Sequence, residues 1–377
     1  MNIVADENIP LVNEFFGALG NVQTLPGRQI NARDVADADI LLVRSVTQVD
    51  QALLHNSAVR FVGSCTAGMD HVDTDFLDRN NITWASAPGC NAEAVVQYAL
   101  TAMARLKPKW MTMTIGIIGC GNVGGRLYHR LRQLGVTCYC YDPFLTDSDC
   151  SDLVSLEHLL ACADIISCHA PLTTTGDFPT YHLLSAREFK QLKPHVLLIN
   201  CGRGAVINNS DLLTFLQTHN DVSVALDVWE NEPDINLALL RLVDIATPHI
   251  AGYSVEGKRN GTAMVAAALG DFLNIDEREI DRFNAIIPCE YQPLNAPAFT
   301  GEQTDSDRLN TLLLTVYDLG VDDSAMRAIV ESKNTRYFFD QLRKSYPARR
   351  DYSYYQCKNR LQKKPLSEWL AALAFNI

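Results

Sequence analysis

The sequence predicts an α/β protein with two doubly wound parallel sheets and a small α+β unit at its C-terminal end. Three observations support this fold class. Short apolar runs alternate with amphipathic segments from the first residue to about residue 275. A glycine-rich turn joins an apolar run to a helical one near residue 120. The composition changes after residue 281, where prolines cluster.

Length and composition limit the classes of protein to consider. At ~150 residues per domain, 377 residues predict two or three domains. Hydrophobic residues make up 47% and charged residues 20%, so a large packed core is expected and wholesale disorder is excluded. The net charge of −12 argues against a nucleic-acid-binding surface, which needs clustered positive charge. A small anionic ligand in a locally basic pocket stays open.

The cysteines and the apolar runs indicate the compartment. The chain has 11 cysteines, an odd number, and contains no Cys-x-x-Cys, which favours reduced thiols over a disulfide framework or a zinc site. No apolar run approaches the ~18 residues that span a bilayer. We therefore expect a cytoplasmic protein with no membrane partner and no bound metal.

The alternation of apolar runs and amphipathic segments over residues 1–93 predicts a parallel sheet covered by helices. Pro10 suits the first turn of a helix, and His71 is interpreted as a helix-start residue. The predicted strands are Asn2–Ala5, Ile40–Arg44, Arg60–Ser64 and Ile82–Ala85, and the predicted helices are Asn8–Leu19 and Asp70–Arg79.

A second alternation of apolar runs and helical segments, from about residue 114 to residue 274, predicts the six strands of a complete doubly wound sheet. A long helix, Asn91–Leu106, precedes it, and another, Val255–Asn274, ends it. The predicted strands are Thr114–Ile118, Thr137–Tyr141, Asp164–Cys168, Val196–Asn200, Val222–Asp227 and Ile245–Thr247.

Residues 286–377 are predicted to form a separate, smaller unit. The segment Asn284–Thr300 contains three prolines and is interpreted as a linker. Apolar stripes on the helices after it favour packing against a second copy, although packing within one subunit stays an alternative. The predicted elements are helices at Ser306–Leu319, Thr335–Ser345 and Ser367–Ala374 and a strand at Tyr352–Cys357, and the stripes are Leu309, Leu312, Leu313, Val316 and Leu319 on the first helix and Tyr337, Phe338 and Leu342 on the second.

A dinucleotide site is predicted where the strand ending at Ile118 meets Gly119-Cys120-Gly121-Asn122-Val123-Gly124. This G-x-G-x-x-G opens a predicted helix, so the pyrophosphate would lie on the helix N-terminus. Asp142 ends the next strand, 21 residues beyond Gly121, where a carboxylate accepts hydrogen bonds from ribose hydroxyls and repels a 2′-phosphate. The sequence therefore predicts a Rossmann domain that binds NAD rather than NADP.

A catalytic group is predicted at the carboxyl edge of the same sheet. Arg203, Glu232 and His249 follow three of its strands, and parallel strands end at one edge. An imidazole is suited to accept a hydroxyl proton, a paired carboxylate stabilises the imidazolium, and a guanidinium binds a carboxylate in a planar fork. Each residue taken singly also has a purely structural interpretation, but together they fit the oxidation of a 2-hydroxy acid.

Four of these segments together resemble the D-isomer-specific 2-hydroxyacid dehydrogenases. They are Gly119–Gly124, the Asn200–Gly204 turn, Asp227–Pro233 and Pro248-His249. The resemblance covers residues 1–275 and implies a flavodoxin-like substrate domain at 1–93, completed by about 275–285, and an NAD-binding domain at 94–274. Residues 286–377 resemble, more loosely, the dimerisation domain of one branch of that family, which implies a homodimer.

Further motifs around Asp6, Arg44, Thr66 and His71 resemble a branch of that family that acts on a phosphorylated 2-hydroxy acid. The resemblance assigns catalysis to Arg203, Glu232 and His249 and substrate contacts to Ser45, Thr66 and Tyr253. It assigns the cofactor site to Gly119, Gly121, Asn122, Val123, Gly124, Asp142, Ala170, Cys201, Gly202, Arg203, Asp227 and Gly252. His169 is expected to border the cofactor through its backbone, and Arg349 and Arg350 are candidates for neutralising the substrate phosphate.

Two alternatives remain at this point. One is a sister enzyme such as 3-phosphoglycerate dehydrogenase. The other is a protein of the same fold that binds NAD and acts as a transcriptional corepressor without catalysis, because such proteins keep the same three polar residues.

Overall fold

The chain folds into two units, and each unit is made of two separate stretches of sequence. A computed structural model describes residues 1–275, 291–300, 302–357, 361 and 363–377. Unit 1 comprises Met1–Asn91 and Ser254–Glu290, of which residues 254–275 are described. Unit 2 comprises Ala92–Tyr253 and Tyr291–Ile377. The three-domain division stays a prediction, and its boundary at residue 274 differs from the return of the chain to unit 1 at Ser254.

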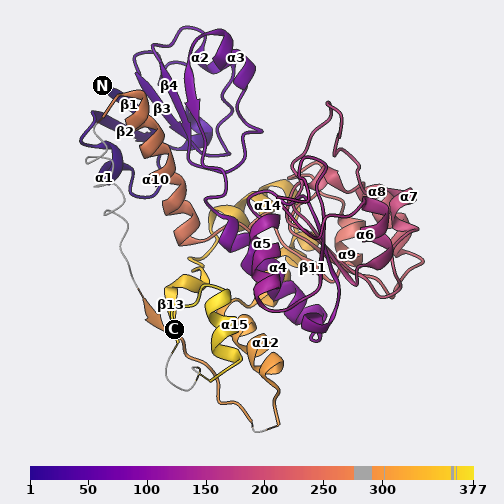
Figure 1. Ribbon diagram of the computed structural model, residues 1–377. Helices are drawn as coiled ribbons and strands as arrows, with labels where there is room; N and C mark the ends of the chain where they lie inside the picture. The colour runs from indigo at the N-terminus through magenta and orange to yellow at the C-terminus, as the bar shows by residue number, and fades with distance from the viewer. Residues whose placement is uncertain (276–290, 301, 358–360, 362) are drawn as a thin grey trace. The chain divides into compact units, whose positions relative to one another are not determined.

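Unit 1 is built on a parallel sheet in the order β2-β1-β3-β4-β5, the flavodoxin-like order. Successive residues of a strand point to opposite faces, so Ile3 and Ala5 join one core while Val4 joins the other. Figure 1 shows α10 beside the strands of this unit, and Val265 and Leu269 of α10 are buried there. The elements are β1 (Asn2–Asp6), α1 (Val12–Phe16), β2 (Asn21–Leu25), η1 (Gly27–Gln29), β3 (Ile40–Val43), α2 (Gln51–Leu54), β4 (Phe61–Ser64), α3 (Thr74–Arg79), β5 (Thr83–Ala85) and α10 (Val255–Phe272).

Three sequence predictions for unit 1 need correction. The first helix begins at Val12 rather than Asn8, because the Asp6 side chain holds Asn8 in a turn and Leu11 has a left-handed φ of 56°. Strand β2 was not predicted, since it pairs only with β1 at the sheet edge and is mostly exposed. His71 is not a helix-start residue, because Asp73 caps α3 and the His71 ring is buried against Ser64.

Unit 2 contains a parallel sheet in the order β11-β10-β9-β8-β6-β7. Its apolar strand residues divide between two cores, one shared with α4 and α5 and the other with α6, α8 and α9. The strand order reverses between β6 and β8, and open α/β sheets bind ligands beside the carboxyl ends of such strands. The elements are α4 (Ala92–Leu106), η2 (Trp110–Thr112), β6 (Ile115–Ile118), α5 (Gly124–Gln133), β7 (Cys138–Tyr141), α6 (Leu156–Cys162), β8 (Ile165–Cys168), α7 (Ala186–Phe189), β9 (Leu197–Asn200), η3 (Gly204–Val206), α8 (Asn209–Leu216), β10 (Ser223–Leu226), α9 (Leu237–Leu242) and β11 (Ile245–Ala246).

The C-terminal segment packs on the same core as the second sheet. The leucine stripe of α12 is buried within unit 2, where α12 contacts α4, and Trp110 Nε1 donates to Asn310 Oδ1 at 2.8 Å. Leu294 and Ala296 are also buried there, so the described part of the predicted linker is not a free connection. The elements are β12 (Gln292–Pro293), α12 (Asp305–Val316), α13 (Leu319–Arg327), η4 (Ala328–Glu331), α14 (Thr335–Lys344), η5 (Tyr352–Tyr354), β13 (Tyr355–Gln356) and α15 (Leu366–Ala372).

The remaining differences in this segment have local causes. The predicted helix Ser306–Leu319 ends at Val316, and the Asp318 side chain caps a new helix, α13, by accepting from Gly320 N at 3.0 Å. The predicted strand Tyr352–Cys357 is a helical turn followed by β13, which pairs with β12. The remainder of the predicted linker, and the chain beyond residue 275 expected to complete the substrate domain, lie outside the described residues.

Candidate active site

The glycine-rich turn after β6 has the backbone geometry of a dinucleotide loop. Gly119 has φ +82°, a conformation that disfavours other residues. A Cβ on Gly124 would lie 1.9 Å from the Gly119 carbonyl oxygen, so only glycine allows α5 to begin this close to the turn. A Cβ on Gly121 would meet no atom within 4 Å. The loop therefore packs tightly against the protein at Gly124 and leaves space for a ligand at Gly121.

Asp142 is fixed at the end of β7 by two backbone donors. Its Oδ2 accepts from Cys120 N at 2.9 Å, and its Oδ1 accepts from Phe144 N at 3.1 Å. The carboxylate is thereby tied to the glycine-rich turn that precedes α5. Its predicted contact with a ribose hydroxyl stays a prediction.

The loops after β8 and β9 meet the glycine-rich turn. A Cβ on Gly119 would lie 2.7 Å from Ala170 N, and one on Gly202 would lie 2.8 Å from the Ala170 carbonyl oxygen. Cys201 beside them is half-buried, and desolvation of its thiol raises the pKa well above the usual range. Most residues predicted for the cofactor are thus brought to one edge of the sheet, with Asn122 and Val123 in the turn itself.

The imidazole and carboxylate predicted for catalysis form a direct pair. His249 Nδ1 lies 2.7 Å from Glu232 Oε2, and Glu232 Oε1 accepts from Trp229 N at 2.8 Å. Burial alone raises the pKa of the Glu232 carboxyl, but the His249 charge and these hydrogen bonds outweigh it and lower the pKa below the ordinary value. Because Nδ1 is engaged, Nε2 is the ring nitrogen available to a substrate.

Asp227 holds the loop that carries His249. Its buried carboxylate accepts from Ile250 N at 2.8 Å, Ala251 N at 2.9 Å and Thr247 Oγ1 at 2.6 Å. The His249 backbone also donates to the Asp227 carbonyl oxygen at 2.7 Å and has a left-handed φ of 58°. These contacts give Asp227 a structural role here, and the predicted contact of Asp227 and Gly252 with the cofactor stays a prediction.

Arg203 extends from a turn organised by Asn200. The Asn200 side chain accepts from Gly202 N at 3.1 Å and donates to the Arg203 carbonyl oxygen at 3.0 Å. Arg203 Nη1 donates to the Gly202 carbonyl oxygen at 3.0 Å, and the side chain is partly buried. The guanidinium therefore leaves the end of β9 in a defined direction.

Arg343 lies on α14 and carries no local sequence signal that would single it out. Its positive charge contributes to lowering the pKa of Glu232, and its guanidinium carbon lies 6.0 Å from the centre of the Tyr253 ring. Tyr253 also meets Tyr346 edge-on, with ring centres 5.8 Å apart. Only the fold brings α14 to this place, since about 110 residues separate Arg343 from Glu232.

The other predicted substrate residues, Ser45 and Thr66, belong to unit 1. Thr66 Oγ1 lies 2.9 Å from Ser64 Oγ, which in turn lies 3.1 Å from His71 Nε2. The buried His71 ring thus helps to orient the Thr66 hydroxyl. Arg44, beside Ser45, pairs with the buried Asp6 at 3.3 Å.

The two basic residues proposed for the substrate phosphate differ in surroundings. Arg349 is buried in unit 2, where its Nη2 donates to the carbonyl oxygens of Ala251 and Ala94 and its guanidinium lies 4.3 Å from the centre of the Tyr317 ring. Arg350 lies over the Tyr354 ring at 3.4 Å. Arg349 therefore binds the backbone of the loop that follows His249, which Asp227 also holds. A phosphate role for either arginine stays a prediction.

Neither a metal centre nor a membrane span is found in the described residues. No group of three His, Cys, Asp or Glu side chains there is placed to hold a metal ion. Within the same residues, no helix is both long enough and apolar enough to cross a bilayer.

A known family matches the part of the chain that contains this candidate site. Residues 94–251 match the family described as the NAD binding domain of D-isomer specific 2-hydroxyacid dehydrogenases. Residues 291–374 match a domain of unknown function, DUF3410. The first match includes the glycine-rich turn and the three predicted catalytic residues.

Relatives extend the similarity over the whole chain. The erythronate-4-phosphate dehydrogenase of Cellvibrio japonicus is 48% identical over 100% of this chain and 99% of its own. That of Pseudomonas putida (strain F1) is 44% identical over 93% of each chain. Among solved structures, Aquifex aeolicus D-lactate dehydrogenase with NAD and lactic acid has a TM-score of 0.64 at 21% identity, over 75% of this chain and 98% of its own. Entamoeba histolytica 3-phosphoglycerate dehydrogenase with NAD⁺ has the same TM-score at 23% identity, over 73% and 95%. These two structures support the fold alone.

Proposed function

The chain belongs to the erythronate-4-phosphate dehydrogenases of the D-isomer-specific 2-hydroxyacid dehydrogenase family, and we propose from this that it oxidises 4-phospho-D-erythronate to 2-oxo-3-hydroxy-4-phosphobutanoate. The reaction serves the biosynthesis of pyridoxal 5′-phosphate. The observation that carries the proposal is the 48% identity to such an enzyme over the full chain length. The His249–Glu232 pair supplies the chemistry that this reaction needs.

The protein is an NAD-dependent dehydrogenase, and the residues present fit NAD. Gly121 leaves room for a ligand, Gly119 and Gly124 shape the turn, and Asp142 presents a carboxylate beside it. When bound, NAD supplies the hydride acceptor. Asp142 favours ribose hydroxyls and disfavours a 2′-phosphate, because two anions repel.

Each of the three catalytic residues has a separate role in the reaction. His249 accepts the proton of the substrate 2-hydroxyl through Nε2, since Nδ1 is bonded to Glu232. Glu232 stabilises the imidazolium that forms and fixes the ring orientation. Arg203 binds the substrate carboxylate in a bidentate manner and stabilises the negative charge that develops on the reacting oxygen.

The substrate phosphate needs further donors. Ser45 and Thr66 would supply hydroxyl groups and Arg44 a positive charge, while Tyr253 would contact the substrate elsewhere. Unit 1 would then serve as the substrate domain, while residues 94–251 bind the cofactor.

Two further features of the proposal concern the assembly and its location. We assign a homodimer mediated by residues 286–377, on the resemblance of this segment to a dimerisation domain. We place the enzyme in the cytoplasm, because the described cysteines are free thiols and such thiols persist in a reducing compartment.

The proposed function is tested by supplying candidate substrates separately. Purified protein with NAD should produce NADH, seen by its fluorescence, when given 4-phospho-D-erythronate and far less when given 3-phosphoglycerate. Preference for 3-phosphoglycerate would assign the chain to the sister activity. Tight NAD binding with no turnover of either compound would favour a non-enzymatic role.

A further inference from the structure

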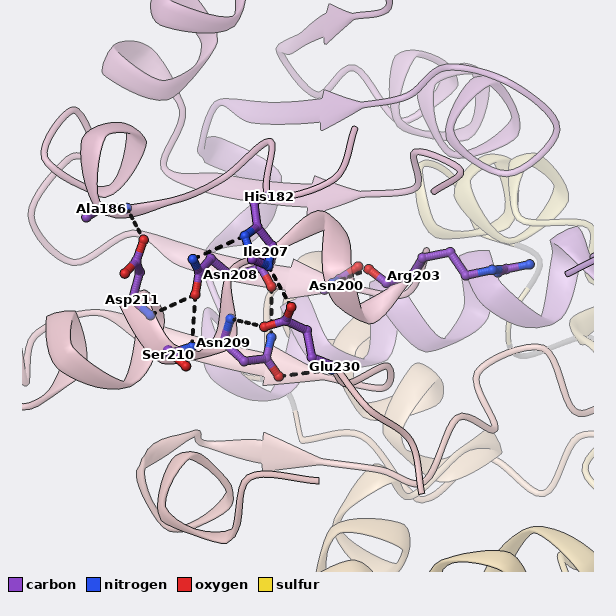
Figure 2. Close-up of polar contacts among 10 residues, drawn as sticks. All are labelled: His182, Ala186, Asn200, Arg203, Ile207, Asn208, Asn209, Ser210, Asp211 and Glu230. Atoms are coloured by element: carbon purple, nitrogen blue, oxygen red, sulfur yellow. Dashed lines mark hydrogen bonds and ion pairs between the residues drawn. The ribbon is translucent and has the colours of Figure 1, made fainter. Parts of the chain in front are cut away.

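A second histidine–carboxylate pair lies beside the catalytic one. His182 Nε2 is 2.6 Å from Glu230 Oε1, and the other oxygen of Glu230 accepts from Asn209 N at 2.7 Å. Glu230 N in turn donates to Asn209 Oδ1 at 3.1 Å, and His182 Nδ1 lies 3.3 Å from Asn208 Nδ2. Figure 2 shows these four side chains, here named the His182–Glu230 network, together with Arg203, which precedes Asn208 and Asn209 in the chain.

The network joins the loops that carry two catalytic residues. Asn208 and Asn209 follow Arg203 by five and six residues, and Glu230 precedes Glu232 by two. The same loops also touch at Gly204, where a Cβ would lie 2.0 Å from the Trp229 carbonyl group and 2.6 Å from Glu230 N. The Arg203 loop is therefore held against the Glu232 loop at two points, of which one is packing and the other is hydrogen bonding.

The cap of α8 determines the hydrogen-bonding direction in the network. Asn208 Oδ1 accepts from Ser210 N at 3.1 Å and Asp211 N at 3.0 Å, so the amide nitrogen must face His182. An amide nitrogen only donates, so His182 Nδ1 accepts and its Nε2–H donates to Glu230. The ring thus acts as a neutral relay between an asparagine and a carboxylate.

We propose that Glu230 and His182 are positioning residues that fix Arg203 relative to Glu232 and His249. This inference rests on the proposed function for its activity test, but the network itself can be observed without substrate. The guanidinium must bind the substrate carboxylate while the imidazole meets the hydroxyl of the adjacent carbon, and a misplacement of ~1 Å can cost ~100-fold in rate.

Glu230→Ala removes both carboxylate oxygens, which accept from His182 Nε2 and Asn209 N. We expect kcat/KM for 4-phospho-D-erythronate to fall by about 10- to 100-fold, mainly through kcat, with NAD affinity nearly unchanged because the glycine-rich turn is not touched. The matched control is Glu188→Ala, since Glu188 accepts from Ser185 N and Oγ at the start of α7 and contacts neither catalytic loop. A similar loss in the control would show that general destabilisation explains the effect.

His182 offers a rescue by a conservative change. Glutamine presents one acceptor and one donor, as the neutral imidazole does here, so His182→Gln should keep most activity while His182→Ala loses it. Both variants bear the same left-handed backbone, φ 54°, so the strain does not distinguish them. His219→Ala is the control, because His219 stacks on Phe215 at 4.0 Å much as His182 stacks on Tyr181 at 3.9 Å but lies exposed beyond the C-terminal end of α8.

A spectroscopic measurement separates this inference from the proposed function. In ¹⁵N-labelled protein at neutral pH, His182 should show an unprotonated Nδ1 and a protonated Nε2, and Glu230→Ala should abolish that preference. Absence of 4-phospho-D-erythronate turnover by the wild type would refute the function and leave this spectrum as the test of the network. The inference is overturned if the spectrum shows the other tautomer or a charged ring, if Glu230→Ala keeps the wild-type kcat/KM, or if His182→Gln is as slow as His182→Ala.

Discussion

At the scale of single residues, the site depends on a division of roles between two carboxylates. Glu232 is partly exposed and bonds the His249 ring, whereas Asp227 is buried and bonds the backbone that follows that histidine. The first adjusts the chemistry of the imidazole, and the second fixes the place of its main chain. Substitutions at the two positions should therefore fail in different ways.

His249→Ala tests the proton acceptor. Loss of a positioned general base typically lowers turnover by ~10²–10⁴-fold. NAD affinity should change little, because the predicted cofactor contacts lie mainly on the loops after β6, β7, β8 and β9. The measurement is kcat beside NAD titration by fluorescence, and near-normal turnover would remove His249 from the role of base.

Glu232→Gln tests the anionic partner. Without the carboxylate the imidazolium is less stable, so the limb of the pH–rate profile that rises with pH should move to lower pH, at a reduced maximum rate. The profile of kcat/KM against pH checks this. An unshifted limb would mean that Glu232 does not act on the titrating group.

The same substitution has a consequence for stability. The pKa of Glu232 is lowered in the folded protein, so its contribution to the free energy of unfolding is present above the ordinary carboxyl pKa of about 4.3 and is lost as pH falls through the lower folded-state value. The wild type should thus lose more stability than Glu232→Gln between about pH 5 and pH 3. Denaturant unfolding at several pH values measures the difference, and parallel curves would contradict it.

Asp142 is expected to determine cofactor choice. Asp142→Asn keeps an acceptor for Cys120 N while removing the charge. NAD binding should weaken and discrimination against NADP should relax, because the repulsion of the 2′-phosphate is lost. The ratio of kcat/KM for the two cofactors is the measurement, and efficient use of NADP by the wild type would refute this assignment.

At the scale of elements, two glycines of the turn between β6 and α5 have different roles, one in folding and the other in ligand binding. Gly124→Ala forces a Cβ to 1.9 Å from the Gly119 oxygen and should destabilise the protein by about 1–3 kcal/mol. Gly121→Ala meets no protein atom within 4 Å, so its thermal midpoint should stay near the wild-type value while NAD affinity falls at least tenfold. Calorimetry and NAD titration on both variants check the contrast. Equal destabilisation of the two variants would contradict the open surroundings of Gly121, and unchanged NAD affinity in Gly121→Ala would show that the open side is not the ligand side.

At the scale of the whole molecule, the leucine stripe of α12 no longer argues for a dimer. Leu309, Leu312 and Leu313 are buried within unit 2, as the alternative interpretation held. The exposed large apolar side chains of this region include Val321 on α13 and, from the stripe predicted on the second helix, Tyr337 on α14. A chain truncated before residue 291 would expose the α4 surface that α12 covers, so the intact chain is the proper subject of a dimer test.

Light scattering of the intact chain should give twice the mass of one chain. Val321→Asp and Tyr337→Asp should weaken the dimer if these side chains lie in its interface, since a charge placed in a buried contact is costly. His219→Ala serves as a surface control. A monomeric mass at micromolar concentration would refute the homodimer.

Local sequence patterns determined much of the fold and the candidate site. Buried parallel strands form continuous apolar runs, and each of the six strands predicted for the second sheet is present within a residue or two of its expected ends. The glycine-rich turn needs particular residues at fixed spacing because of backbone sterics within a few residues. Arg203, Glu232 and His249 follow strands, so the geometry of a parallel sheet brings their loops to one edge.

Contacts between distant segments decided the rest. The edge strand β2 is stabilised by pairing with β1 and carries little apolar pattern of its own. Three contacts join residues more than 40 positions apart in the sequence. They are the packing of the α12 leucines within unit 2, the approach of Arg343 to Glu232 and the pairing of His182 with Glu230. The local sequence indicates that an apolar stripe must be buried or that a charged side chain must be paired. Only the packed chain determines which residues do so.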